Sequence, residues 1–339
     1  MTAAGDPSGD PSGGLPDGLA GRLGVGLAVG NGAVRVRIDH RPGRPVAALL
    51  VGKPREQATV LVPAVLNLCA VAHRQAATAA VGLGSGDAAG TRQETVRDHA
   101  IAILRDWPAC LGAPAEAGAL RVVGALASGQ AGAADALRRQ IAGSSAGTGA
   151  ELRHFTIAEL ERWLAAGETA TVRLLAGVRR GFDPAWGRAA LPAPTLRDLE
   201  EAALPAREVT CADRVRGMPL LQAVEAAEGR SLFARLLGRI LDLLGWLEGG
   251  PGRPAEPAPP GIGLAEASRG LLIHRAVLDG GRIAGYRIVT PTDWNLAEGG
   301  LLQRMLASLP ADERLEPAAR LALACVDPCL PTDLHLYRD

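Results

Sequence analysis

Apolar residues recur along most of the chain at intervals of three and four positions, which is the spacing of amphipathic helices. The broadest stripe lies in 219–247, where Leu or Ile occupies most positions of one helical face. Similar spacing predicts helices at about 55–82, 92–105, 132–142, 156–177 and 299–308. The charged positions of 92–98 are expected to form a solvated face of their helix.

Strand patterns are fewer and shorter. Ala33–Asp39 alternates Val and Ile with Arg and Asp, and a turn-rich segment separates it from a second apolar run, Val46–Val51. A β-hairpin is therefore expected there. Gly270–His274 and Arg282–Val289 flank Leu278–Gly281, whose Asp-Gly-Gly sequence favours a second hairpin. The chain is predicted to be α+β and mainly helical, with small antiparallel β-sheets.

Clusters of Gly and Pro mark the breaks in these patterns. Residues 1–17 are rich in Gly, Pro, Ser and Asp and are predicted to be a disordered N-terminal tail. Residues 249–261 are rich in Pro and Gly and are predicted to be a loop. The remainder, 18–339, is long enough to bury a large core and is expected to form a single domain.

Charge and composition exclude several classes of protein. Lys and Arg number 36, and so do Asp and Glu, which gives no reason to expect binding to nucleic acid or to an anionic membrane. No apolar stretch reaches the ~18 residues of a membrane span, and the first residues lack the basic and apolar parts of a signal peptide. Five scattered cysteines form no disulfide framework. These features predict a cytoplasmic protein.

Each end of the chain carries part of a metal-binding motif. Cys69 and His73 lie four positions apart, and on one helix they would share a face. Cys329 and His335 lie near the other end. Each cysteine stands like the first residue of a Cys-x-x-Cys pair whose second cysteine is absent. Soft metals prefer thiolate ligands, so Cys69 and Cys329 are candidate metal ligands.

Other interpretations of these four residues stay open. A free cysteine on an Ala-rich helix is often a buried apolar side chain rather than a ligand. Either histidine can be an ordinary core residue that has found a hydrogen-bond partner. Two cysteines and two histidines also have the ligand count of a structural zinc site.

Four segments, taken in order, resemble the large subunit of nickel-iron hydrogenases. Leu68–His73 is similar to that family's first Cys-Gly-x-Cys motif with its following His, and Glu266–Gly270 to Glu-Ala-Pro-Arg-Gly. Gly281–Asn295 is similar to Gly-Lys-Ile-x-Asn-Tyr and Pro-Thr-Thr-Trp-Asn, and Asp327–His335 to Asp-Pro-Cys-x-x-Cys-x-x-His. Residues 110–255 carry little resemblance. The similarity implies a shortened large-subunit fold in which both ends of the chain meet at one buried site.

The resemblance also shows what this chain lacks. In that family four cysteines hold a nickel and an iron, and the iron carries two cyanides and one carbon monoxide. Cys69 and Cys329 match the first cysteine of each pair, whereas Ala72 and Thr332 stand in the positions of the bridging cysteines. Two thiolates cannot form the bimetallic site, so we expect neither nickel nor hydrogenase catalysis. These departures resemble accessory proteins that are similar to the large subunit and assist assembly of its iron cofactor.

The residues that remain imply a site for the iron fragment alone. The two cysteines would hold the iron with its two cyanides and one carbon monoxide. Arg269 and Thr292 match the family's cyanide-binding residues, and Pro291 would form an apolar wall beside the carbon monoxide. Hydrogen bonds close to the ligands would come from His73 and His335.

The resemblance implies a non-catalytic scaffold or chaperone that transiently binds the iron fragment and helps deliver it to the catalytic large subunit. The implied partners are a small iron-carrying hydrogenase chaperone, the cyanide-delivery maturation proteins and the large-subunit precursor, with no nucleic acid and no membrane insertion. One alternative is a metal-free interaction protein that mimics the large subunit and binds assembly factors. A structural zinc protein and a catalytic large subunit are weaker alternatives.

Overall fold

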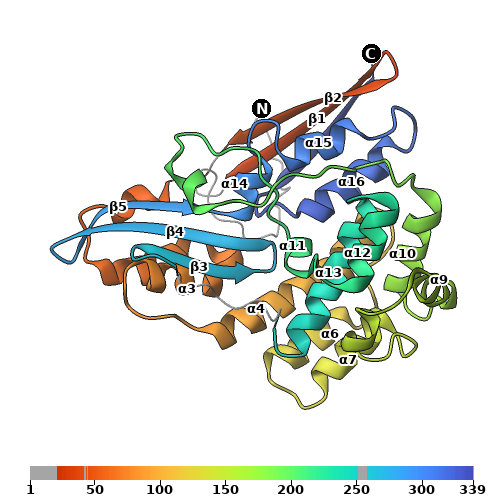
Figure 1. The fold of residues 1–339 in the computed structure, drawn as a ribbon, viewed down its shortest axis with the longest axis horizontal. Coiled ribbons are helices and arrows are strands. Elements are labelled where there is room, and N and C mark those ends of the chain that lie inside the picture. The colour runs from red at the N-terminus through yellow and green to blue at the C-terminus, as the bar shows by residue number, and fades with distance from the viewer. Residues whose placement is uncertain (1–20, 42, 44, 251–257, 339) are drawn as a thin grey trace, which may run out of the picture.

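The computed structural model describes residues 21–338 except 42, 44 and 251–257, and it consists of two small β-sheets beside a larger body of helices (Figure 1). The first sheet has the order β2-β1-β6 and the second the order β3-β4-β5. The predicted tail, 1–17, and the centre of the predicted loop at 249–261 lie outside the described residues.

The first sheet corrects the predicted N-terminal hairpin. Strand β1 (Arg22–Gly30) pairs antiparallel with β2 (Ala33–Arg41), whereas the run expected as the second strand forms the short helix α1 (Val46–Leu50). Gly occupies several outward positions of β1, so its alternating pattern is faint. The sheet is also mixed rather than antiparallel, because β6 (Thr332–Arg338) pairs parallel with β1.

The second sheet is antiparallel, as predicted. Strands β4 (Gly270–Asp279) and β5 (Arg282–Val289) form the expected hairpin, and both glycines of its turn have the positive φ that a tight turn requires. A third strand, β3 (Ile262–Ala267), pairs with β4 and was not predicted. Its six residues are too few for a clear period.

Two of the long predicted helices are each split by a glycine in the left-handed region. Gly167 (φ 56°) separates α9 from α10, and Gly229 (φ 76°) separates α12 from α13. The helices besides α1 are α2 (Ala58–Val65), α3 (Ala70–Ala80), α4 (Ala88–Ile101), α5 (Trp107–Cys110), α6 (Ala119–Ala127), α7 (Ala133–Ala142), α8 (Gly149–Leu152), α9 (Ile157–Ala166), α10 (Ala170–Gly181), α11 (Cys211–Val215), α12 (Pro219–Glu228), α13 (Leu232–Leu247), α14 (Pro291–Asn295), α15 (Leu301–Ala307) and α16 (Leu315–Val326).

The segment 55–82 is also not one helix. A short 3-10 turn, Asn67–Cys69, separates α2 from α3, and the helical axis bends by 101° there. Cys69 therefore precedes α3 with φ −127°, and the expected i, i+4 pair on one helical face does not form. Taken singly, no helix in the described ranges is long and apolar enough to cross a membrane; the bent pair 55–65 and 67–80 meets that test only jointly.

Helix α13 lies in the middle of the helical body and is buried along almost its whole length (Figure 1). Its Leu and Ile residues form the centre of the largest core cluster. Three charged residues interrupt the apolar sequence of this helix, namely Arg235, Arg239 and Asp242, and all three are buried. Their spacing of four and three positions places them on one face. Buried charges of this kind require partners, and these partners lead to the candidate site.

Candidate functional site

Four segments that are distant in sequence supply the candidate site. Cys69 lies at the start of α3, Arg269 in the turn between β3 and β4, and Thr292 in the first turn of α14. Cys329 lies between α16 and β6. The structure joins them in two contacts, one for each sulfur. All five cysteines of the chain are free, as expected.

The first contact is between Cys69 and Arg269. The Nη1 group of Arg269 donates to the Cys69 Sγ at 3.4 Å. Burial raises the pKa of the Cys69 thiol to about 12, although the charge of Arg269 acts in the opposite direction. The charge of Cys329 contributes to the same shift, so the two sulfurs interact electrostatically. The Cys69 thiol is therefore neutral at pH 7.

The second contact is between Cys329 and Thr292. The backbone N–H of Cys329 donates to the Thr292 Oγ1 at 3.1 Å, and that hydroxyl lies 3.1 Å from the Cys329 Sγ. Because the oxygen already accepts a hydrogen bond, its own hydrogen is available for the sulfur. Burial raises the pKa of Cys329, while the Thr292 hydrogen bond and the charge of Arg269 lower it.

The start of α14 fixes the position of Thr292. Thr290 caps the helix, because its side chain accepts from the Asp293 N–H while the Asp293 carboxylate accepts from the Thr290 N–H. Pro291 occupies the first helical position, where its missing N–H costs nothing, and it is buried next to Thr292. The sequence Thr-Pro-Thr-Asp therefore forms a rigid helix start that presents one hydroxyl to Cys329.

Asp327 holds the guanidinium of Arg269 from the other side. The Nε of Arg269 donates to the Asp327 backbone oxygen at 3.1 Å and lies 3.3 Å from its carboxylate, while Asp98 lies 3.6 Å from Nη1. Despite burial, the charge of Asp327 raises the pKa of Arg269. Asp327 ends α16 in the left-handed region with φ 50°, a conformation that Asp tolerates better than most residues.

The hydrogen-bond chain continues from Asp327 into the protein interior. Arg239 donates to the Asp327 carboxylate at 2.6 Å and, through its Nε, to the His99 Nδ1 at 3.0 Å. The His99 Nε2 lies 2.8 Å from Asp242, which accepts two hydrogen bonds from Arg214 at 3.0 and 2.7 Å. We call this run, from Arg269 through Arg214, the buried ion chain.

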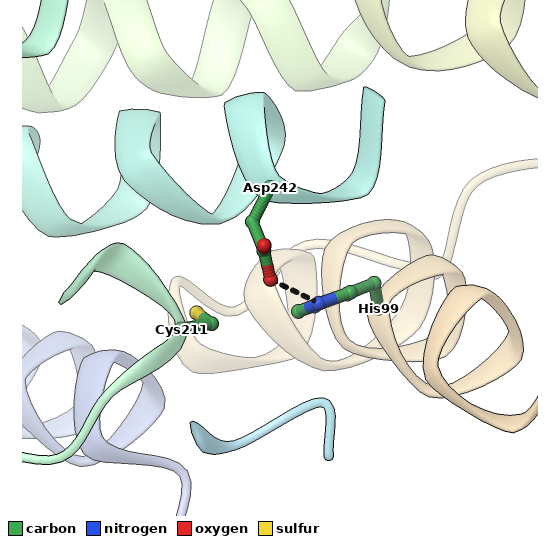
Figure 2. A group of neighbouring side chains, drawn as sticks. All are labelled: His99, Cys211 and Asp242. Atoms are coloured by element: carbon green, nitrogen blue, oxygen red, sulfur yellow. Dashed lines mark hydrogen bonds and ion pairs between the residues drawn. The ribbon is translucent and has the colours of Figure 1, made fainter. Parts of the chain in front are cut away.

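Two members of the ion chain, His99 and Asp242, form with Cys211 a group of possible metal ligands (Figure 2). Within the described residues this is the one group of three or more donors whose ligand atoms lie within 4.8 Å of one another. Arg239 can only donate to the His99 Nδ1, so the His99 hydrogen is on Nε2 and points to Asp242. Both ring nitrogens are thus engaged, and two guanidiniums disfavour a cation here.

Asp242 remains charged in this environment. Burial opposes ionisation, but the Arg214 guanidinium and the His99 hydrogen bond lower the pKa of Asp242 to about 2. Burial also lowers the pKa of His99, which is therefore neutral at pH 7. The ion chain alternates cation and anion around a neutral imidazole, and this alternation offsets the cost of burying each charge.

The charged residues of 92–98 do not form a wholly solvated face, contrary to the prediction. Glu94 is only 6% exposed, and its carboxylate accepts the N–H groups of Val71 and Ala72 at 3.0 Å each. It therefore caps the helix that begins just after Cys69. Asp98 is nearly buried beside Arg269. The sequence alone does not show that Glu94 and Asp98 are buried, because the partner of each residue lies on a different structural element.

The structure shows a hydrogen bond from His73 to another histidine. Its Nδ1 lies 3.0 Å from the Nε2 of His274, whose Nδ1 lies 2.9 Å from the Tyr286 hydroxyl. Burial lowers the pKa of His73 to about 4, so the ring is neutral at pH 7. The hydrogen bond of the His73 Nδ1 thus joins α3 to the second sheet rather than to a cysteine.

His335 is not brought to the cysteines. It lies exposed on β6, because the alternate residues Leu334 and Leu336 pack against the core and turn His335 to the outer face. The alternative zinc site therefore does not form, since the two histidines and two cysteines are not among the donor groups that converge in the described structure. Ala72 is fully buried in α3, and Thr332 begins β6.

Comparison with solved structures identifies the class of fold. The chain matches the nickel-iron-selenium hydrogenase of Desulfovibrio vulgaris Hildenborough with a TM-score of 0.54 and 16% identity, over 89% of this chain and 94% of that chain. The fold is that of the nickel-iron hydrogenase large subunit, and the predicted fold class is confirmed. No protein-family model matches the sequence.

Curated relatives narrow the identification. The chain is 35% identical over 297 residues to the hydrogenase expression/formation protein HupK of Rhodobacter capsulatus, covering 86% of this chain and 90% of that protein. It is 30% identical over 350 residues to HupK of Azotobacter vinelandii, covering 93% and 98%. The chain belongs to the HupK family of hydrogenase expression/formation proteins. This membership supports an accessory role, in agreement with the resemblance seen in the sequence.

Proposed function

We propose that this protein is a non-catalytic scaffold in hydrogenase maturation that transiently binds iron carrying two cyanides and one carbon monoxide. The observation that carries the proposal is the convergence of Cys69 with Arg269 and of Cys329 with Thr292, at 3.4 and 3.1 Å. Each pair combines a potential iron ligand with a hydrogen-bond donor. The iron fragment is the cargo of this site rather than a resident cofactor.

The donors suit a fragment that bears cyanides. A cyanide nitrogen accepts hydrogen bonds, and charge-assisted bonds from a guanidinium are about twice as strong as neutral ones. Arg269 is already oriented by Asp327, so little side-chain freedom is lost when it donates to an incoming ligand. The Thr292 hydroxyl would supply a second donor if its one hydrogen turned from the Cys329 sulfur to a cyanide, and the buried Pro291 would supply an apolar wall for the carbon monoxide.

The state of the thiols sets a condition for loading. Both have pKa values raised by burial, and metal binding requires the thiolate form. Loading therefore releases protons, and the nearby Arg269 stabilises the resulting negative charge. Because protons compete with the metal, two such cysteines hold the fragment less firmly than preformed thiolates would.

The replaced positions explain why binding would be transient. Ala72 offers a methyl group where the similar family has a bridging thiolate, and Thr332 offers a hydroxyl that bonds the Leu330 backbone oxygen at 3.0 Å. A site with two thiolates binds the fragment more weakly than one with four. Transfer of the fragment to a precursor with four cysteines is therefore favourable in free energy. We expect no nickel to bind to this protein.

The proposed partners follow from this role. A small iron-carrying hydrogenase chaperone and the cyanide-delivery maturation proteins would load the site, and the precursor of the large subunit would receive the fragment. These steps precede assembly of the complete enzyme, and we place them in the cytoplasm.

Infrared spectroscopy of anaerobically purified protein, co-expressed with the maturation proteins, tests the proposal. Bound cyanide and carbon monoxide absorb where protein does not, so the loaded protein gives their bands. We expect Cys69→Ala and Cys329→Ala to abolish the bands and Cys110→Ala, a half-buried thiol outside the site, to retain them. If the wild type lacks the bands and Cys69→Ala supports full maturation, the protein acts instead as a metal-free mimic of the large subunit.

A further inference from the structure

The outer face of the first sheet is a trough with a glycine floor. Alternate residues of β1, namely Leu23, Val25 and Leu27, point into the core and are fully buried. The residues between them on the outer face include Gly24 and Gly26, which have no side chains to fill the space. The resulting hollow has a volume of about 380 Å³, within the range of small ligand sites.

The strand register defines the walls of this trough. Gly26 pairs with Arg37 on β2 and with His335 on β6, so these two side chains stand on either side of it. Gly24 pairs in the same way with Asp39 and Asp333. Two strand spacings separate the walls by roughly 10 Å. The four residue steps of β1 from Arg22 to Gly26 give a length of about 13 Å.

Among the described residues that line the trough, the ion pairs along the walls leave one cation, Arg37, unmatched. Asp39 is bonded to Arg41 at 2.9 Å, and Asp333 to Arg22 at 3.2 Å. Arg37, in contrast, has neither a hydrogen bond nor an ion pair with any residue in the described part of the chain. Its guanidinium lines the middle of the trough and gives it an excess positive charge.

Two further side chains complete the wall opposite Arg37. His335 offers an imidazole, and Tyr337 is 57% exposed. A Cβ added at Gly26 would lie only 3.1 Å from the Tyr337 ring, so the ring leans over the glycine floor. The trough thus combines a guanidinium without a partner among the described residues, an imidazole, a phenol and an open stretch of backbone.

We propose that this trough binds an extended acidic segment of a partner protein, with a carboxylate on Arg37 and a neighbouring side chain against Tyr337. The excess charge selects an acidic partner, and both carboxylates of the trough are already paired, which disfavours a cation. A single exposed guanidinium binds an isolated anion weakly, so recognition requires several contacts along the trough. The length of the trough matches a short extended segment.

This proposal goes beyond the proposed function and does not depend on iron. It uses the outer face of β6, where His335 lies, although the motif of this residue suggested a place beside the metal. Cys329 lies only a few residues before β6 in the sequence. A partner docked on this strand therefore contacts a part of the chain that is next to one of the two thiols. The trough is therefore a place where a partner can engage the chain next to its candidate site.

Fluorescence anisotropy with the full-length protein tests the inference. The probe is a fluorescein-labelled octapeptide of alternating Glu and Val, and the matched probe alternates Gln and Val. We expect the acidic peptide to bind about tenfold more tightly than the neutral one, and Arg37→Gln to remove most of that difference. Tyr337→Ala weakens both peptides, whereas Arg162→Gln, an exposed arginine on α9, changes neither. Circular dichroism verifies that each variant is folded.

Three results would overturn the inference. The two peptides could bind equally, or Arg37→Gln could behave like Arg162→Gln; either result removes the charge recognition. Alternatively, inorganic phosphate could bind in an Arg37-dependent manner while the acidic peptide does not, which would make the trough a free-anion site. Cys329→Ala retains peptide binding if the inference is correct, so its outcome is independent of whether the protein binds iron.

Discussion

Arg239 and Asp327 form a largely buried ion pair of 2.6 Å that links the central helix α13 to the segment carrying Cys329. The same carboxylate lies 3.3 Å from Arg269, which in turn donates to Cys69. The position of the candidate cyanide donor therefore depends on a side chain from the middle of the chain, where the sequence carries little resemblance to the hydrogenase large subunit.

Replacing Arg239 tests this dependence. Arg239→Met leaves Asp327 and His99 without their shared partner in a buried environment, and we expect the free energy of unfolding to fall by about 3–5 kcal/mol. Urea denaturation measures the change. Arg320→Met, which breaks an exposed pair with Glu316 on α16, is expected to cost less than about 1 kcal/mol. Similar losses in the free energy of unfolding for both variants would show that the pair of Arg239 with Asp327 stabilises the fold no more than an exposed pair does.

Thr292 is expected to control the reactivity of Cys329. Thr292→Val removes the hydroxyl hydrogen bond that lowers the pKa of this thiol, so the thiolate becomes less populated. Alkylation of Cys329 by iodoacetamide at pH 8.5, followed by mass spectrometry of the peptide, should slow by about fivefold. Thr292→Ser keeps the hydroxyl and should react at the wild-type rate. Equal rates for the Val and Ser variants would contradict the assigned hydrogen bond.

The buried His73 predicts a loss of stability in mild acid. Its pKa is about 4 in the folded protein and about 6.5 in the unfolded chain, so the unfolded chain binds the proton first as the pH falls. The stabilisation that depends on neutral His73 is fully present above pH 6.5. It decreases as the pH falls, and about 3 kcal/mol of the free energy of unfolding is lost near pH 4. Urea denaturation at pH 7, 5.5 and 4 measures this slope.

His73→Gln isolates that contribution, because Gln can still bond to His274 but does not titrate. We expect a shallower decline of stability between pH 6.5 and 4 than in the wild type, while His154→Gln, at an exposed position, leaves the slope as it was. A His73→Gln profile that superimposes on the wild type would place the acid sensitivity in other buried groups.

Restoring the absent cysteines tests the idea of weak, transient binding. The double variant Ala72→Cys with Thr332→Cys should retain the cyanide and carbon monoxide bands after incubation with large-subunit precursor, whereas the wild type should lose them. The double Ser variant at the same positions controls for the change in size, since Ala72 is fully buried and insertion of a larger atom costs about 1–3 kcal/mol. Delivery of iron at the wild-type rate by the double Cys variant would refute the affinity gradient.

Local patterns predicted part of this structure well. The hairpin of β4 and β5 was predictable because the Asp-Gly-Gly turn and the flanking strands lie within one short segment. Helix α7 was predictable because its apolar period ends at a glycine. The strand β1 was missed because glycine occupies its outer positions, and β6 was missed because its pairing partner lies at the other end of the chain.

The candidate site was predictable only as far as the motifs reach. The motifs gave Cys69, Cys329, Arg269 and Thr292, which the structure does bring into two contacts. The supporting ion chain was not foreseen, because its members come from separate elements and pair only in three dimensions. One signal for it was present in the sequence. Charged residues spaced by four and three positions interrupt an otherwise apolar helix, and charges in a buried helix require oppositely charged or hydrogen-bonding partners.

The parallel pairing of β6 with β1 has a consequence for biosynthesis. The Leu23 N–H bonds the Pro331 oxygen at 2.9 Å, so β6 aligns with β1 only after all the residues between them have been synthesised. Contacts of such long sequence separation form late in folding. A chain that stops before Cys329 thus has Cys69 but not the second thiol, and under the proposed function it cannot take up the iron fragment.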